Sequence, residues 1–281
     1  MKQKLIILAF FCLIVYSIKA QEITVLTYNV KFDDTRDTVN GWNNRKDFMV
    51  SQLSFYEPDI FGTQEGLINQ LKFLKENLSN YNFIGVGRDK GNSEGEHTAI
   101  FYKTDKLKVL EHSTFWLSET PQKPSKGWDA ALNRICSYAL FKHNGSKQSF
   151  WVFNTHFDHM GKQARKESVK LILKKIEELN HKKLPVILMG DFNLEPNNES
   201  IVKLSQVMND VHLTKGINIF GPAGTFNGFN FHEPVTRRID YIFLSKTDFK
   251  VVKYAVLSDS KNCKYPSDHL PVLAKVNFKR E

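Results

Sequence analysis

The chain has 281 residues, of which 41% are hydrophobic and 25% are charged, and its formal net charge is +9. The positive excess is modest and no dense run of lysine and arginine occurs, which argues against a strong nucleic-acid footprint but favours anionic partners. A generally lysine-rich surface is the alternative explanation. No spacing of the three cysteines suggests a zinc site, and no linker or short-period repeat divides the chain.

The first twenty residues are typical of a secretory signal peptide. They hold a lysine-containing start, an almost unbroken apolar run over 5–18, and the small residue Ala20 at the expected cleavage point. A run of about 14 residues is too short to cross a bilayer comfortably, although an uncleaved anchor is the alternative. We therefore expect a signal peptide at 1–20 and one monomeric domain at 21–281, exported to the periplasm or the outside without a stable membrane anchor. Without the three lysines of the leader, the net charge falls from +9 to +6.

Alternating or fully apolar segments rich in β-branched residues predict strands, and apolar residues spaced three or four apart predict helices. A segment with two prolines and a glycine, 118–133, is expected to be a long loop. In chain order, we predict a strand at 23–30, helices at 45–56 and 67–78, strands at 98–103, 106–111, 134–142 and 149–155, a helix at 162–180, and strands at 185–189, 238–244, 249–257 and 271–277.

In this order strands outnumber helices, and the helices fall into two groups separated by strands. Two packed β-sheets with helices on the outside, a mixed α+β sandwich, accommodate such an order best. A doubly wound parallel sheet is the alternative, but too few helices intervene between the strands over 98–155.

Two cysteines, Cys136 and Cys263, remain after loss of the leader. Export permits a disulfide between them. Because Cys136 lies in an apolar segment predicted to be a buried strand, we expect two isolated thiols, and a bridge is the alternative.

The predicted strand at 185–189 ends at a glycine, after which Asp191 and Asn193 occupy alternate positions. Alternation places both side chains on one side of an extended chain end. A carboxylate there can hold or deprotonate a water, and the amide can bond the same water or a phosphate oxygen. The alternative is an ordinary Asp/Asn turn.

Asp268 and His269 directly precede the last predicted strand. Histidine is the side chain best suited to change its protonation near neutral pH. Asp240 opens another apolar strand, where a charge is costly unless it has a partner. Pairing with His269 would supply that partner and orient the ring. The alternatives are a capped turn around His269 and a salt bridge from Asp240 to Arg237 or Arg238.

Three further strand ends carry polar residues. His156 is placed to donate to a phosphate oxygen, and a structural histidine is the alternative. Its neighbours Asp158 and His159 raise a metal site as an option, but hard cations prefer oxygen ligands, so we assign these two to loop structure.

Glu65 could bind magnesium, which needs few protein ligands, although a helix-start glutamate is the simpler interpretation of that residue alone. Asn29 is uninformative by itself.

Taken together, these segments resemble the endonuclease/exonuclease/phosphatase superfamily, also called deoxyribonuclease I-like. Each motif is weak, but the ordered set is specific and covers the chain from about residue 23 to residue 277. The resemblance implies a four-layer α/β/β/α sandwich of two mixed β-sheets flanked by helices, with the site at one rim of the sheets. It also implies Mg²⁺ or Mn²⁺. The residues that carry it are, in order, Asn29, Gln64, Glu65, His156, Gly190, Asp191, Phe192, Asn193, Asp240, Ser267, Asp268 and His269.

The resemblance implies a role for each matching residue. Glu65 would be the principal metal ligand, with Asn29 and Asp268 close to the metal. Asp191 would orient or deprotonate the attacking water, and Asn193 would support that water or the phosphate.

The histidines would contact the phosphate. His156 and His269 take this role in the resemblance, and Asp240 would pair with His269. Glu96 is a loose match for a partner of His156. Arg134, which follows the long predicted loop, could reach an anionic substrate.

These roles predict metal-assisted, in-line attack of water on a phosphate ester, with phosphodiesters favoured over phosphomonoesters. Nucleic acid, a phospholipid headgroup or a small phosphorylated metabolite would be the substrate. A non-catalytic binding module on the same scaffold is the alternative, and the intact set of acids and histidines argues against it.

The motifs indicate the branch of the family less specifically than the family itself. Residues 190–193 with Pro196, together with 99–103, are similar to the deadenylase and nocturnin branch, whereas 237–241 are similar to the abasic-site nucleases. An export signal argues against intracellular messenger or genome-repair work. The overall likeness is greatest to exported bacterial members of uncertain substrate, which share the features at 115–118 and 127–130. An aromatic stretch could contact a membrane, or it could be a packed loop: Phe220, Phe226, Phe229 and Phe231.

Overall fold

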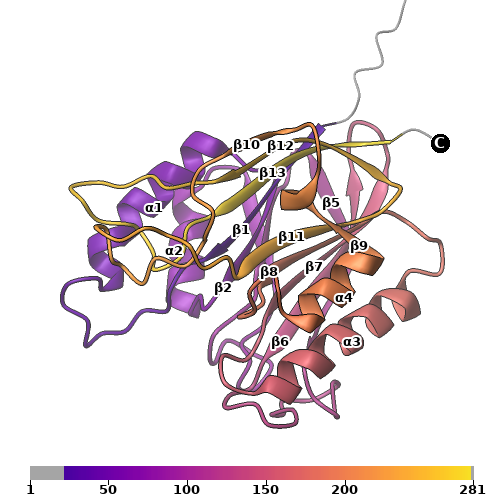
Figure 1. Cartoon of the computed structure of the whole chain (residues 1–281), viewed down its shortest axis with the longest axis horizontal. Coiled ribbons are helices and arrows are strands. Elements are labelled where there is room, and N and C mark those ends of the chain that lie inside the picture. Colours follow the sequence, from indigo (N-terminus) through magenta and orange to yellow (C-terminus); the bar gives the residue numbers. More distant parts are fainter. Residues whose placement is uncertain (1–21, 280–281) are drawn as a thin grey trace, which may run out of the picture.

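The computed structural model of the chain describes residues 22–279, which build two β-sheets packed face to face with helices on both outer sides (Figure 1). The predicted signal peptide at 1–20 lies outside the described residues. Both sheets contain parallel and antiparallel pairs. The four-layer sandwich of two mixed sheets that the resemblance implied is therefore confirmed.

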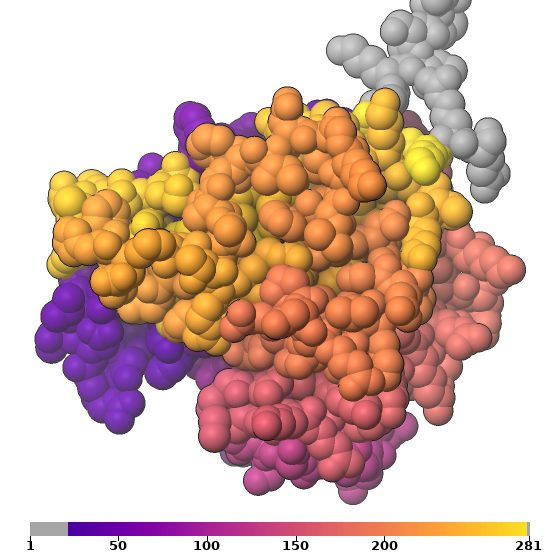
Figure 2. Space-filling view, in the orientation of Figure 1, coloured from indigo at the N-terminus to yellow at the C-terminus, as the bar shows by residue number. Residues whose placement is uncertain are grey.

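The first sheet is covered on its outer face by α1 (Trp42–Tyr56) and α2 (Ile68–Asn77). Its seven strands follow the order β10 (Asn218–Phe220), β12 (Phe249–Val256), β13 (Val272–Phe278), β1 (Glu22–Asn29), β2 (Ile60–Gln64), β4 (Ile100–Lys103) and β3 (Tyr81–Ile84). In this order the last strand of the chain is paired with the first. Figure 2 shows C-terminal residues in yellow close to N-terminal residues in indigo on one face.

The second sheet is covered by α3 (Lys162–Leu179) and α4 (Glu199–Val207), and the short 3₁₀ helix η1 (Val211–Leu213) follows α4 and β9. Its six strands follow the order β5 (Leu107–Trp116), β6 (Ile135–His143), β7 (Ser149–His156), β8 (Val186–Asp191), β11 (Asp240–Ser245) and β9 (Met208–Asp210). Strands β7 and β8 are parallel, whereas β8 and β11 are antiparallel.

Alternate residues of the central strands enter two different hydrophobic clusters. In β8, Ile187 and Met189 face the core between the sheets, whereas Val186 and Leu188 pack against the helices. Strand β1 alternates in the same way between the inter-sheet core and the α1–α2 side. Burial on both faces explains the continuous apolar runs in the sequence, and alternation determines which side the last residue of each strand faces.

A polar cross-link between the sheets lies next to this core. The buried amide of Asn154 donates to the carbonyl oxygens of Thr63 and Ala99, both at 2.9 Å, and accepts from Gln64 at 2.6 Å. A Cβ at Gly62 would lie 2.6 Å from the Asn154 side chain, so only glycine allows the sheets to approach this closely here.

We expect Asn154→Ala to lower the free energy of unfolding by about 3 kcal/mol, because it leaves several buried polar groups without partners. Urea unfolding monitored by tryptophan fluorescence measures this change. Asn144→Ala, on an exposed turn, is the matched control. A loss as small as that of the control would contradict the cross-link.

Several elements were not predicted from the sequence. Strands β3, β9 and β10 have three or four residues, too few for alternation to be recognised. Helix α4 has nine residues, and β5 continues beyond its predicted end to Trp116.

Cys136 is buried and Cys263 is exposed, and both are free thiols, as expected. Among residues 22–279, no helix is both long and apolar enough to cross a membrane.

Candidate active site

Three adjacent strands of the second sheet carry polar residues at one rim. In the strand register, His156 of β7 and Asp240 of β11 lie opposite Asp191 of β8. Alternation along β8 places Asp191 on the same face as Ile187 and Met189, which is the inter-sheet side. The three side chains are buried and converge between the sheets.

The first sheet contributes residues from the ends of β1 and β2. Asn29 closes β1, and its amide donates to Asp191 at 3.0 Å and to Glu65 at 3.1 Å. Glu65 follows β2 in the left-handed region with φ 63°, a conformation that costs energy and is held by its surroundings. The hydroxyl of Ser267 donates to the carbonyl oxygen of Asn29 at 2.6 Å, which ties the C-terminal motif to β1.

The turn after β8 has a backbone that positions two side chains. Gly190 has φ 146°, and a Cβ there would lie 2.0 Å from a carbonyl oxygen of β7, so only glycine fits. The backbone N–H of Asn193 donates to Asp191 Oδ1 at 2.9 Å. The Asn193 amide lies 3.3 Å from His156 Nε2. The predicted neighbourhood of Asp191, Asn193 and His156 is therefore present.

His269 and Asp240 form a close buried pair. His269 Nδ1 lies 2.9 Å from Asp240 Oδ2, and His269 Nε2 lies 3.7 Å from Asp191 Oδ2. Burial alone would lower the pKa of His269, but the carboxylates of Asp240 and Asp191 raise it to about 10. At neutral pH the ring is therefore an imidazolium that donates from Nδ1 to Asp240 and presents Nε2–H toward the site.

The arginines before Asp240 pair with other acids. Arg238 donates to both carboxylate oxygens of Asp210, at 3.1 and 2.8 Å, and Arg237 lies 3.5 Å from Glu195. The salt-bridge alternative for Asp240 is thus not realised, and the predicted pairing with His269 is confirmed.

Asp191 lies at the centre of the cluster. Its Oδ2 is 3.0 Å from the Asn29 amide, 3.4 Å from His156 Nε2 and 3.7 Å from His269 Nε2. Burial and the charge of Asp240 raise the pKa of Asp191 to about 7. A carboxylate with a pKa near neutrality is well suited to accept a proton from water.

His156 stays neutral chiefly because it is buried, and the cations around it act in the same direction. Its ring lies about 3 Å from Arg134 Nη1, and burial together with the charges of Arg134 and Arg88 lowers its pKa well below the usual value. Arg134 itself is buried and also contacts His159 and Asp158. Arg134 thus holds His156 in place, and its direct contact with substrate stays a prediction.

The expected pairing of Glu96 with His156 is wrong. Glu96 Oε2 accepts from Arg88 Nη1 at 2.7 Å, because a hairpin-like turn brings these two residues together. Burial nevertheless raises the pKa of Glu96 to about 7. Glu96 lines a small hollow with His156 without bonding to it.

Asp158 has the structural role that the sequence predicted for it. It accepts from four backbone N–H groups, those of Ala131, Leu132, Met160 and Gly161. Although burial opposes ionisation, these bonds and Arg134 hold the pKa of Asp158 well below its usual range. The carboxylate therefore joins two loops beside His156.

We expect Asp158→Asn to destabilise the fold by about 2 kcal/mol at neutral pH, because charge-assisted bonds are lost. Since the folded pKa is depressed, this stability is present above the unfolded value of about 3.9 and is lost as the pH falls further. Urea unfolding at pH 7 and pH 3 measures both chains. Their difference should shrink at pH 3, and a constant difference would contradict this assignment.

Two of the predicted metal ligands, Glu65 and Asp268, lie beside the ammonium group of Lys31. Lys31 Nζ is 3.7 Å from Glu65 Oε2 and 3.5 Å from Asp268 Oδ2, so the two carboxylates are spaced to share a positive charge. The Asn29 amide adjoins Glu65. Carboxylate oxygens suit Mg²⁺ and Mn²⁺, so Glu65 and Asp268 fit a divalent ion, whereas Asn29 turns its amide nitrogen to Glu65 and its Oδ1 accepts from the Lys31 N–H.

A second group, Asp191, Asp240 and His269, has possible ligand atoms within 4.8 Å of one another. Distance alone would allow a metal there. However, His269 Nδ1 is already bonded to Asp240 at 2.9 Å. Hard cations such as Mg²⁺ prefer oxygen ligands, which favours the group around Glu65.

Arg45 is a site residue that the sequence analysis missed. Its guanidinium donates to the carbonyl oxygens of Val30, Lys31 and Pro266, which joins the segment after β1 to the C-terminal motif. The available signal was helical spacing, because Arg45 shares the buried face of α1 with Met49.

Most of the aromatic stretch is packed. The Phe226 ring lies edge-on to the His269 ring at 5.1 Å, and the Phe231 ring lies 5.3 Å from the Tyr265 ring. Only Phe220, 70% exposed, projects strongly. The packed-loop alternative therefore describes this segment better than a membrane-contacting hairpin.

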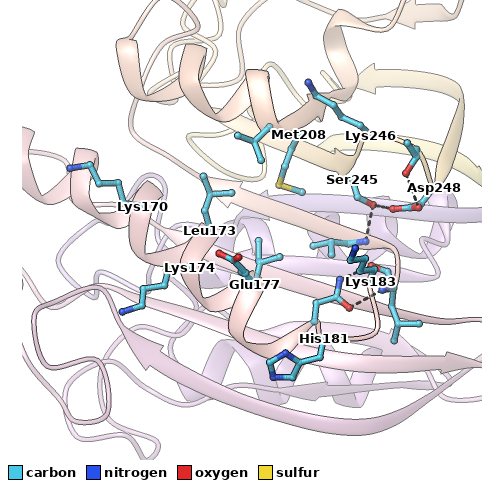
Figure 3. A pocket seen from close by; sticks show the side chains of 16 residues that line it. Lys170, Leu173, Lys174, Glu177, His181, Lys183, Met208, Ser245, Lys246 and Asp248 are labelled. Carbon is cyan, nitrogen blue, oxygen red and sulfur yellow. Dashed lines mark hydrogen bonds between the residues drawn. The ribbon is translucent and has the colours of Figure 1, made fainter.

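A large surface hollow lies away from this site. It measures about 900 Å³ and lies at the opposite end of β8, between the C-terminal parts of α3 and α4 (Figure 3). Val186 lines it, whereas Asp191 ends the same strand at the candidate site. Size alone therefore does not locate the chemistry.

Comparisons with known proteins agree with the geometry. The endonuclease/exonuclease/phosphatase family matches residues 26–269. A family protein from Bacteroides thetaiotaomicron is 41% identical with a TM-score of 0.87, covering 92% of this chain and 99% of that one. A mannosyl-6-phosphatase from the same organism is 42% identical with a TM-score of 0.85, covering 92% of this chain and 100% of that one.

A more distant relative is the exoribonuclease subunit Ccr4 of Mycosarcoma maydis, 22% identical over 92% of this chain. This chain spans 51% of that protein's length. Members of the matched family are hydrolases that act on phosphate esters, and they generally depend on divalent metal ions. The length of the family match and the identities above 40% show that this chain belongs to the endonuclease/exonuclease/phosphatase family.

Proposed function

We propose that the protein is an exported, Mg²⁺- or Mn²⁺-dependent phosphomonoesterase that acts on a small phosphorylated metabolite, with sugar phosphates as the leading class. Phosphoester hydrolysis is supported mainly by the cluster around Asp191 Oδ2. In this cluster the proposed base Asp191 lies beside the cationic His269 ring and the Asn29 amide. The leader at 1–20 supports export.

Two observations support monoesters over the phosphodiesters that the sequence favoured. The 42% identity to a mannosyl-6-phosphatase extends over the whole of that chain. In addition, Asp191, His156 and His269 are only 1–5% exposed. A terminal phosphate group would reach such buried side chains more easily than the interior of a polymer backbone.

The residues divide the reaction among them. Asp191, with a pKa of about 7, takes a proton from the attacking water. The His269 imidazolium, held by Asp240, stabilises negative charge that develops on the phosphate oxygens. Neutral His156 and the Asn193 amide orient the phosphate.

The metal would be held by Glu65 and Asp268 beside Asn29, where it would supply further positive charge to the phosphate oxygens. The ligand set contains oxygen donors only, which suits a hard cation.

A substrate panel tests the proposal. Mannose 6-phosphate, glucose 6-phosphate, bis-p-nitrophenyl phosphate, DNA and RNA are each incubated with Mg²⁺, with Mn²⁺ and with excess EDTA. We expect phosphate release from a sugar monoester, abolished by EDTA and restored by metal. Hydrolysis that survives exhaustive chelation would contradict the metal assignment.

The panel also separates the alternatives. Cleavage of bis-p-nitrophenyl phosphate or RNA without release from sugar phosphates would favour the phosphodiesterase, in line with the likeness to Ccr4. Metal binding without hydrolysis of any ester would favour a non-catalytic binding module. Export is tested by fractionating cells that express the full chain and a chain lacking residues 2–20, where only the former should leave the cytoplasm.

A further inference from the structure

Lys31 places a positive charge within the group that fits a divalent metal. Its ammonium lies between the carboxylates of Glu65 and Asp268, at 3.7 and 3.5 Å. The carboxylate side chains are 14% and 11% exposed and the lysine side chain 29% exposed, so solvent screens these contacts only partly.

The backbone of Lys31 is held firmly in an unfavourable conformation. Its φ is 57°, in the left-handed region that ordinary residues avoid. Its N–H donates to Asn29 Oδ1 at 3.1 Å, while its carbonyl oxygen accepts from Arg45 at 2.6 Å and from Gln70 at 2.9 Å. Because strain persists only where surrounding contacts impose it, these bonds fix the Cα from which the side chain enters the site.

The position of the Lys31 ammonium affects the charge balance of the metal site. Two neighbouring carboxylates repel each other, and the ammonium offsets one of their two negative charges. A divalent ion that binds Glu65 and Asp268 must displace the ammonium or tolerate its repulsion. The other acids nearby already have cationic partners: Asp191 and Asp240 lie beside His269, and Glu96 pairs with Arg88. They therefore offer little compensation for a second divalent ion.

We propose that Lys31 is a built-in counter-ion of the metal site, which competes with divalent cations for Glu65 and Asp268 and restricts the site to one ion. This inference rests on the proposed function only in placing a divalent ion between those carboxylates. The lysine keeps the carboxylates paired in the metal-free protein, and the resulting competition weakens metal binding.

Isothermal titration calorimetry with Mg²⁺ and with Mn²⁺ tests the proposal on the purified protein. The wild-type chain should bind one ion, and Lys31→Met should bind it at least about tenfold more tightly, because a nearby like charge is removed. Lys31→Arg should remain close to wild type, since it keeps the charge. Lys72→Met, which removes the same charge from an exposed position on α2, should also remain close to wild type.

Thermal unfolding supplies a second measurement that needs no substrate. In EDTA, Lys31→Met should melt below wild type because two carboxylates lose their counter-ion. Saturating Mn²⁺ should raise the Tm of Lys31→Met by more than it raises the Tm of wild type. Lys31→Gln is measured in parallel, so that poor folding of one variant does not prevent the comparison.

Equal or weaker metal binding by Lys31→Met and Lys31→Gln would overturn the proposal, as would two ions bound per wild-type chain. Absence of divalent binding by wild type would overturn both this proposal and the metal site itself. The expected binding pattern without hydrolysis of any phosphate ester would leave the counter-ion role standing and remove only the proposed function.

Discussion

Asp191→Asn is expected to lower kcat/KM for the preferred phosphate ester by about 10²- to 10⁴-fold, the range that general bases contribute. The asparagine side chain has the same shape and can still accept from the Asn29 amide through its oxygen, so the fold should be retained. It cannot accept a proton from water, which removes the group whose pKa of about 7 suits that step.

Steady-state kinetics at saturating metal measures this loss, and thermal unfolding checks that the variant is folded. Asp248→Asn, a carboxylate at the far hollow, is the matched control and should keep wild-type activity. A loss below about tenfold for Asp191→Asn would show that another group accepts the proton, and the base assignment would then be wrong.

Replacing His269 with glutamine is expected to reduce both activity and stability. Activity should fall by roughly a thousandfold, because a positive donor toward the phosphate is removed. Stability should fall by about 3–5 kcal/mol, because Asp240 is left as a buried carboxylate whose charged partner is gone. This partner lies at 2.9 Å, and Asp240 is 1% exposed.

The double variant Asp240→Asn/His269→Gln separates the two effects. Removing both members of a buried pair eliminates the unpaired charge, so much of the lost stability should return. Activity should fall no further than in His269→Gln alone, because residues that act as one unit give non-additive losses. Additive losses in stability would show that Asp240 and His269 act independently, contrary to their short contact.

The directions of the site side chains were accessible from the sequence because strand alternation is a local property. Ile187, Met189 and Asp191 occupy alternate positions, so they share one face of β8 wherever that strand lies. The resemblance of the ordered motifs to a known family then implied that several strand ends belong to one site. Asp240 was predicted to need a partner for a similar local reason, namely its position at the start of an apolar strand.

Contacts between side chains that are distant in the sequence were harder to predict from the sequence. Glu96 was expected beside His156, but the turn between Arg88 and Glu96 supplies a closer guanidinium. Several residues could have been the partner, and sequence contains no distance with which to choose among them. Short strands such as β9 and β10 were missed for a related reason, since neighbours in the sheet determine them more than their own residues do.

By itself, the sequence determined the set of chemical groups, the strands that end with them and the face on which each side chain lies, because these depend on neighbours within a few residues. Only the tertiary structure decided that Asn29 bonds Asp191, 162 positions away, and that Lys31 lies between Glu65 and Asp268. The first contact arises from the packing of one sheet on the other, whereas the second joins the ends of neighbouring strands within the first sheet. They set the pKa values and charge balance of the site, because burial and the distances between charges exist only in the folded chain.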